Sequence, residues 1–248
     1  MRHTYLGVAA LLLPTGLAAA ASAGILGSAQ NFAVLGGSTV TNTGPTVITG
    51  NLGVWPGTAI TGFPPGIVNG MIHASDAVAQ QAQSDVTTAY NTLAGMALTQ
   101  DLTGMNLGGM TLGPGVYFFS SSAFLTGTLT LDAMGNPNAL FVFQIGSTLI
   151  SASNSSVMTI NSADACEVYW QVGSSATLGT DSTFQGNILA LTSITLTTRA
   201  SLVEGRALAR NGAVTMDSNI ITAHCIPTPG AAALFGMVFV GATARRRG

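Results

Sequence analysis

Residues 169–225 read YWQVGSSATLGTDSTFQGN, ILALTSITLTTRASLVEGR and ALARNGAVTMDSNIITAHC, which are three consecutive segments of equal length. Each segment has the same order: an apolar run, a turn of small residues, a Thr-containing strand and a third short strand. A repeat of about 20 residues with three strands per unit is typical of a β-solenoid, in which stacked coils bury one another's apolar sides. The stretch therefore predicts a mainly β protein whose core forms by stacking.

Looser copies of this unit occur earlier in the chain. Apolar runs begin at Val116 and Phe141, and coil-like sequence also begins at Phe32 and Leu52. These copies lie on both sides of residues 75–94, which do not fit the pattern. We therefore predict a solenoid that is interrupted in sequence and continuous in space.

Residues 75–94 have the pattern of one long amphipathic helix. Apolar residues such as Val78, Val86 and Leu93 lie three or four positions apart, and Gly95 ends the run. The first strand of each unit is apolar on both faces, as in FVFQI at 141–145, which indicates a strand covered on both sides. We expect the helix to be that cover.

Alternation along the second strand of each unit assigns its two faces. Leu178, Leu196 and Met216 face inward if these strands contribute to the core, so the threonines beside them face outward. Rows of β-branched Thr with stiff side chains would present methyl and hydroxyl groups at spacings of about 4.8 Å between coils and about 6.7 Å along a strand. The alternative is that Thr simply suits solenoid strands. The candidate binding residues are Thr39, Thr41, Thr61, Thr148, Thr177, Thr195, Thr197 and Thr215.

The composition excludes several classes of protein. Only 6% of the residues are charged, against about 25% in ordinary soluble domains. All seven basic residues are Arg, and residues 24–226 hold three Arg and nine acidic residues, a net charge of 3 − 9 = −6. A nucleic-acid binder needs a basic surface, so we expect no nucleic-acid partner. We expect a monomer.

The N-terminus has the features of a secretory signal peptide over residues 1–23. An apolar run at 5–13 is followed by the small residues Ala21-Ser22-Ala23, which fit a cleavage site. An uncleaved anchor is the alternative. In an exported protein the only two cysteines, Cys166 and Cys225, suggest one disulfide, and two separate buried thiols are the other possibility.

Residues 227–248 have the features of a second targeting segment, at the C-terminus. They contain Pro227-Thr228-Pro229, an apolar run at 231–244 and an Arg cluster at 245–247. This order resembles the PEP-CTERM-type sorting tails of Gram-negative bacteria, although Thr228 stands where those tails usually have Glu. The resemblance implies a chain that is secreted or anchored at the bacterial cell surface, with membrane contact only through this tail. A simple C-terminal membrane anchor is the alternative.

The domain between these ends, residues 24–226, carries further family features. The stretches are NFAVL at 31–35, VITGNLG at 47–53, AITGF at 59–63, LGPGVY at 112–117, VFQI at 142–145, YWQV at 169–172, FQGNILA at 184–190 and GRALAR at 205–210. Together they resemble the bacterial and fungal ice-binding proteins. The resemblance implies a discontinuous right-handed β-solenoid of triangular cross-section with one helix along a face. It also implies adsorption to ice crystals through one flat, Thr-rich face.

Other chemistries find little support in the sequence. Solenoid enzymes that act on polysaccharides need clustered carboxylates, but here the acidic residues are scattered, and only Asp164 and Glu167 are close. His73 and His224 have no partners at metal-ligand spacing, so we expect no metal and no cofactor. We expect no enzyme. A cell-surface adhesin that binds glycans or surfaces is the main alternative to ice binding.

Overall fold

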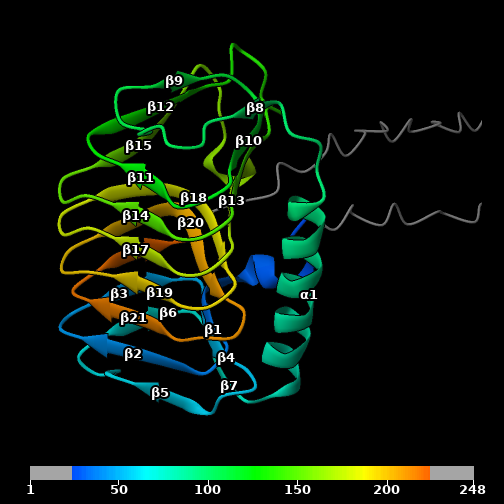
Figure 1. Cartoon of the computed structure of the whole chain (residues 1–248). Helices are drawn as coiled ribbons and strands as arrows, with labels where there is room; N and C mark the ends of the chain where they lie inside the picture. The colour runs from blue at the N-terminus through cyan, green and yellow to red at the C-terminus, as the bar shows by residue number, and fades with distance from the viewer. Residues whose placement is uncertain (1–23, 224–248) are drawn as a thin grey trace, which may run out of the picture.

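The structure is a computed structural model that describes residues 24–223. This part of the chain is mainly β, with parallel strands in two sheets, one α-helix and two short 3-10 helices, η1 (Gly27–Asn31) and η2 (Ala165–Glu167). Figure 1 shows the strands stacked in layers, with the helix α1 standing along one side of the stack. The expectation of a mainly β protein with parallel sheets and one helix is confirmed.

The chain passes repeatedly between a large sheet and a small sheet. The large sheet has 15 strands and the small sheet has seven. The strands of the large sheet are β1 (Phe32–Gly36), β3 (Val47–Thr49), β4 (Asn51–Val54), β6 (Ile67–Asn69), β7 (Ile72–Ala74), β8 (Gln100–Asp101), β9 (Thr111–Leu112), β10 (Gly115–Phe119), β12 (Thr128–Asp132), β13 (Phe141–Ile145), β15 (Ser156–Ile160), β16 (Val168–Val172), β18 (Thr183–Ala190), β20 (Ser201–Ala209) and β22 (Ile220–Thr222). In spatial order, the strands of the small sheet are β11 (Ala123–Leu125), β14 (Leu149–Ser151), β17 (Ala176–Leu178), β19 (Ile194–Leu196), β21 (Val214–Asp217), β2 (Thr39–Thr43) and β5 (Ala59–Thr61).

Segments far apart in the sequence are neighbours in both sheets. In the large sheet β1 pairs with β20, with Val34 level with Ala207. In the small sheet β2 pairs with β21, with Val40 level with Val214. The first strands of the described chain therefore continue the stack that its last strands form, while α1 lies between them in sequence.

A sharp bend in β18 turns the chain from one part of the large sheet to the next. Gly186 has φ +97°, and a Cβ atom there would lie 2.7 Å from Cγ1 of Val168. The register between β18 and β20 shifts at this point. Only glycine fits this backbone conformation and this close approach without strain.

The helix α1 (Ala77–Ala94) starts two residues after the predicted start and ends where predicted. Asp76 caps it by accepting a hydrogen bond from the Ala79 N–H at 2.8 Å, which satisfies one of the free donors of the first turn. The expected burial of Val78 is wrong, since its side chain is 49% exposed. Ala79 and Gln83 are buried instead.

The burial of Gln83 has a specific cause. Its Nε2 group donates to the carbonyl oxygens of Ala209 and Arg210, at 2.8 and 2.7 Å, at the end of β20. In the other direction, Gln144 of β13 donates to the carbonyls of Leu93 and Met96, at 2.7 and 2.9 Å, at the end of α1. Apolar repeats alone cannot predict these polar contacts between helix and sheet.

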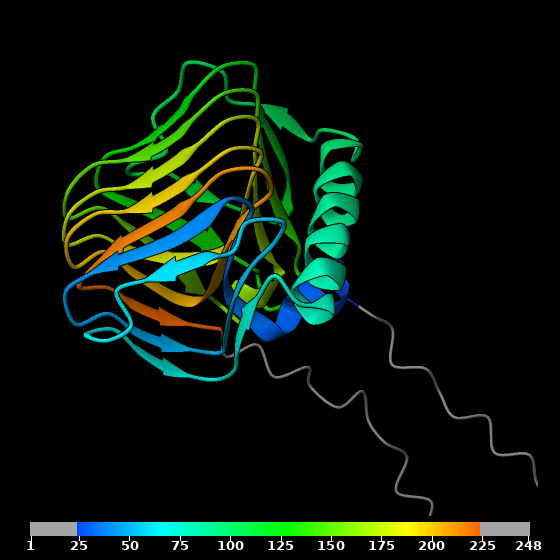
Figure 2. The same cartoon turned by 90° about the horizontal axis from the view of Figure 1, so that it is seen from below.

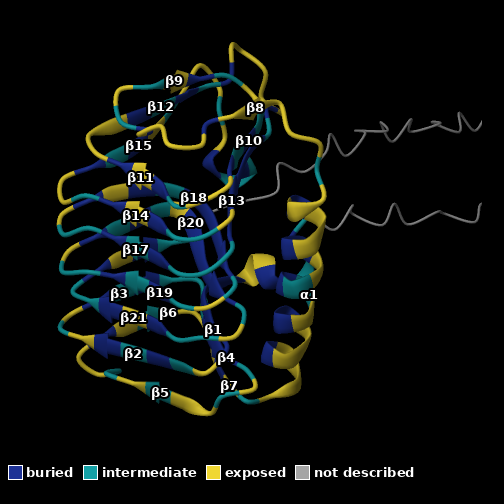
Figure 3. Cartoon of the chain, viewed as in Figure 1, coloured by how far each residue is buried: buried dark blue, intermediate teal, exposed yellow. Residues whose placement is uncertain are grey.

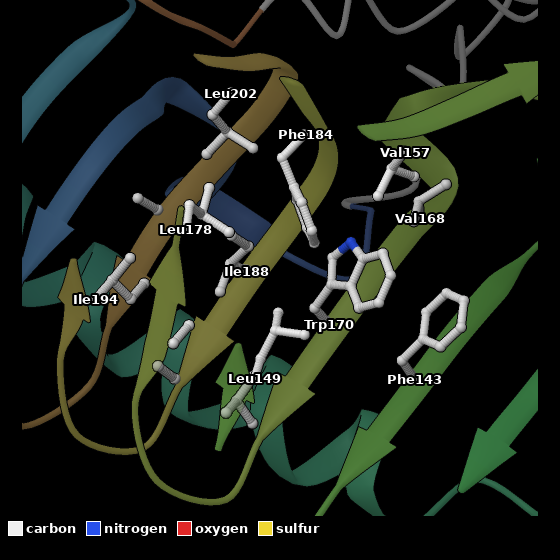
Figure 4. Packing of buried hydrophobic residues seen from close by; sticks show 14 of the residues in the cluster. Phe143, Leu149, Val157, Val168, Trp170, Leu178, Phe184, Ile188, Ile194 and Leu202 are labelled. Carbon is white, nitrogen blue, oxygen red and sulfur yellow. The ribbon is translucent and has the colours of Figure 1, made fainter. Parts of the chain in front are cut away.

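Two apolar cores hold the layers together. One lies inside the stack and includes the stacked rings of Phe143 and Trp170, whose centroids are 4.0 Å apart, with Phe184 on the other side of Trp170 (Figure 4). The other lies between α1 and the large sheet, and includes Tyr169 and Leu189. The prediction that the helix covers the doubly apolar strands is confirmed by this second core, and Figure 3 shows the buried side of α1 turned toward the sheet.

Among residues 24–223, no helix is long and apolar enough to cross a membrane.

Candidate functional site

The small sheet carries a continuous row of threonines on its outer face. The strand registers place Thr177 level with Thr195, Thr195 with Thr215, Thr215 with Thr41, and Thr41 with Thr61. These five residues, one from each of β17, β19, β21, β2 and β5, are called the threonine row. Figure 1 shows the five strands as successive layers on the side of the stack away from α1.

The row faces outward because the residues that alternate with it fill the core. Leu178, Leu196 and Met216 are at most 1% exposed, as the sequence pattern predicts. Of the threonines themselves, Thr61 and Thr215 are exposed and the other three are half-buried.

The spacing of the row comes from the backbone. Neighbouring strands lie about 4.8 Å apart, and alternate residues along one strand lie about 6.7 Å apart. The hydroxyl groups of Thr41 and Thr215 are in contact, with Oγ1 of Thr41 donating to Oγ1 of Thr215 at 3.4 Å. Because Thr has few allowed side-chain torsions, the row is ordered before any ligand arrives.

Two of the predicted residues lie beside the row, toward the start of each strand. Thr39 is two residues before Thr41 on the same strand, and it is level with Ala59. The expectation that Thr148 continues the row is wrong. Leu149 is level with Ala176, so Thr148 stands two positions earlier, next to the hydroxyl of Ser122 at 2.7 Å.

The last predicted residue, Thr197, lies on the opposite flank. Its Oγ1 donates to the Leu178 carbonyl at 2.7 Å and lies 3.3 Å from the hydroxyl oxygen of Thr180. This hydroxyl therefore ties one strand of the stack to the next. The structure thus brings five of the eight predicted threonines into one row and places the other three at its sides.

Two residues of the outer face are absent from the predicted set. Ile150 of β14 is level with Thr177, and Phe124 of β11 is level with Ile150. Their side chains are 38% and 48% exposed. The sequence pattern alone does not find them, because Leu149 can be matched with Ala176 or with Leu178, and both of these residues are buried and apolar.

The face carries almost no charge. Among the residues of the seven strands, Asp217 is the only charged one. Its carboxylate accepts hydrogen bonds from the hydroxyls of Thr198 at 2.6 Å and Ser218 at 3.0 Å. These bonds hold the charge at the corner of the sheet, beside the row.

The described residues offer little for metal binding or acid–base chemistry. Within residues 24–223, no group of three or more His, Cys, Asp or Glu side chains could hold a metal ion. Asp164 caps η2 by accepting from the Cys166 N–H at 2.8 Å. Burial, together with the nearby Asp164 carboxylate, raises the pKa of Glu167. Cys225, the predicted partner of Cys166, lies outside the described residues, so their disulfide stays a prediction, and His224 also lies outside them.

The fold and this face together define a class of protein. It is a mainly β binding protein with two parallel sheets, one of which presents a nearly uncharged row of hydroxyl and methyl groups. Such a face matches an extended, regularly repeating ligand, since its threonines repeat at the spacing of the strands.

Known proteins share this architecture and sequence. The profile of the family described as ice-binding-like matches residues 34–222. The chain is 66% identical over 212 residues to an ice-binding protein of Nostoc sp. (strain HG1), a match that covers 86% of this chain and 78% of that protein. The crystal structure of an ice-binding protein from an Antarctic biological consortium is 54% identical with a TM-score of 0.77, covering 79% of this chain and 89% of the other.

A fungal structure has the same TM-score and a lower sequence identity. The ice-binding protein of the Antarctic ascomycete Antarctomyces psychrotrophicus has a TM-score of 0.77 and 43% identity, over 79% of this chain and 96% of that one. The chain belongs to the ice-binding-like family.

Proposed function

We propose that this protein adsorbs to ice through the outer face of its small sheet, with the threonine row at the centre of the contact. The observation that carries the proposal is the level alignment of five threonines on five adjacent strands. Their hydroxyls can hold water at fixed positions, and their methyl groups fill the spaces between. Water held in this way can join the surface of a growing crystal.

The low charge of the face supports the same function. A charged side chain binds water strongly in its own geometry and would disturb an ice-like layer. The single carboxylate of the sheet, on Asp217, accepts hydrogen bonds from the hydroxyl groups of Thr198 and Ser218. The relatives named above are ice-binding proteins, which favours binding to ice over catalysis for this chain.

The finer architecture belongs to the same proposal. We propose that the chain is a right-handed β-solenoid with three strands per coil and a triangular cross-section, and that it acts as a monomer. The view from below in Figure 2 supports the solenoid, since the strands enclose an interior while α1 lies outside it, and that interior is the apolar core of the stack. A solenoid gives the small sheet its flatness, because each coil adds one strand at the same spacing.

Replacement of Thr195 by Tyr tests the function. Thr195 is the second residue of the row, and a tyrosine ring there would stand above the plane of its neighbours. We expect thermal hysteresis and ice shaping to fall sharply, while circular dichroism and the unfolding temperature stay close to those of the unchanged protein. Thr183→Tyr on β18 is the matched control, because Thr183 is exposed on the large sheet. Unchanged hysteresis in Thr195→Tyr would move the site to another face.

The two ends of the chain lie outside the described residues, and their roles are proposals. Residues 1–23 would direct export, and residues 227–248 would hold the protein at the cell surface or be removed there. Cys166 would pair with Cys225 in the oxidising environment outside the cytoplasm. Intact mass and thiol counting on protein from the native host test the removal of residues 1–23, the removal of residues 227–248 and the disulfide. Each of these changes alters the mass of the protein, and the disulfide also removes two free thiols.

A further inference from the structure

The central row of the small sheet changes its chemistry at one end. Across β17, β19, β21, β2 and β5 the central position is Thr, whereas on β14 and β11 it is Ile150 and Phe124. We propose that Ile150 and Phe124 set the boundary of the ice-contacting surface, so that contact stops at Thr177. This inference rests on the proposed function and assigns a size to its site.

The sheet itself does not end at this boundary. β11, β14 and β17 pair in parallel with unbroken register, so the backbone that would carry a longer row is already present. The hydroxyls of one flank also continue, since Ser122 and Thr148 are in contact at 2.7 Å. On the other flank, beside Thr197, Gly179 and Ala152 interrupt the hydroxyls, which return at Thr126.

At the central position the hydroxyl-bearing threonines give way to wholly apolar side chains, which cannot replace Thr. Neither Ile150 nor Phe124 has a group that can hydrogen-bond to water. The ring of Phe124 also extends several bonds farther from the backbone than the γ atoms of a threonine. A flat crystal that meets the threonine row would be held away from the sheet at this ring.

Neither residue is needed for the core. Their exposed fractions of 38% and 48% contrast with the inward neighbours Leu149 and Leu125, which are at most 1% exposed. Substitutions at surface positions have much smaller effects on stability than substitutions in the core. Thr is also a favourable residue in strands.

The test is a gain of function. In the double variant Ile150→Thr/Phe124→Thr, seven level threonines replace five, so the row lengthens from about 19 Å to about 29 Å at the strand spacing of about 4.8 Å. We expect thermal hysteresis at equal molar concentration to rise about 1.4-fold, in proportion to seven against five aligned residues. The matched control is Ile67→Thr/Ile220→Thr, which also places Thr at two exposed apolar positions, here on the large sheet, where the exposed fractions are 55% and 54%. We expect no change there.

A second variant tests the boundary in the opposite direction. Thr177→Ile moves the boundary one strand inward, so hysteresis should fall to about four-fifths of the starting value at an unchanged strand spacing. The proposal is overturned if a folded double variant has equal or lower hysteresis, or if Thr177→Ile has no effect. Thr195→Tyr, measured beside these, separates the two proposals. If Thr195→Tyr abolishes hysteresis while the double variant does not raise it or Thr177→Ile does not lower it, the proposed boundary is wrong and the proposed ice-binding face stands.

Discussion

Replacing Leu196 by Ala tests the assignment of inner and outer residues beneath the threonine row. Leu196 lies in β19, is 1% exposed, and stands level with Leu178 and Met216 in the inward column. Its neighbour Thr195 points the other way. The substitution leaves a cavity in a stack whose layers cannot collapse independently.

The expected cost follows from this packing. Removing a fully buried Leu side chain in favour of Ala costs about 3 kcal/mol, which lowers the unfolding temperature by about 6–12 °C in a domain of this size. Thr195→Val is the matched control because it alters the outward residue beside it. Its cost should be about 0.5 kcal/mol or less, as for other surface positions.

Urea unfolding followed by circular dichroism, together with calorimetry, measures both variants. The free energy of unfolding should fall in Leu196→Ala and stay nearly constant in Thr195→Val. A neutral Leu196→Ala beside a strongly destabilised Thr195→Val would refute the reasoning. It would place the threonine inside the stack and the leucine on the surface.

Two further predictions concern the attachment of α1. Replacing the buried Gln83 by Leu leaves two backbone carbonyls at the end of β20 without their hydrogen-bond donors. The free energy of unfolding, measured by urea titration, should therefore fall by about 1–3 kcal/mol. The matched control is Gln80→Leu, which should be neutral in the same titration because Gln80 is exposed. Asp85 accepts from the Ser28 hydroxyl and N–H, at 2.6 and 2.7 Å. Burial alone would raise the pKa of Asp85, but these hydrogen bonds lower it below its ordinary value. A depressed folded pKa stabilises the protein above the unfolded pKa of about 3.9 and loses that contribution as the pH falls through the folded value. Asp85→Asn should therefore have a lower unfolding temperature than the unchanged protein at pH 7, with the difference shrinking below about pH 4; a constant difference would contradict this.

The alternation along the strands makes much of the site predictable. Short strands with a buried face must alternate, so the inward positions of Leu178 and Leu196 determine that Thr177 and Thr195 point outward. The helix is predictable for a similar reason, because its apolar residues recur at helical spacing and Gly95 ends it.

Register between distant strands does not follow from the same pattern. Leu149 fits equally well beside Ala176 or Leu178, since both positions are inward and apolar, and the choice moves Thr148 by two positions. The prediction for the helix face fails at Val78 because burial there depends on what α1 meets. The polar Gln83 is buried because two sheet carbonyls need its donors.

The pairing of β2 with β21 has a consequence for how the protein is made. The contact between Thr41 and Thr215 joins residues 174 positions apart, in the middle of the threonine row. The first of these strands leaves the ribosome long before its neighbour exists, so the row stays in two pieces until β21 has been made. Contacts of such long sequence separation slow folding and leave strand edges exposed meanwhile. A chain that stops short of β21 therefore carries no complete row, because β21 joins the two pieces.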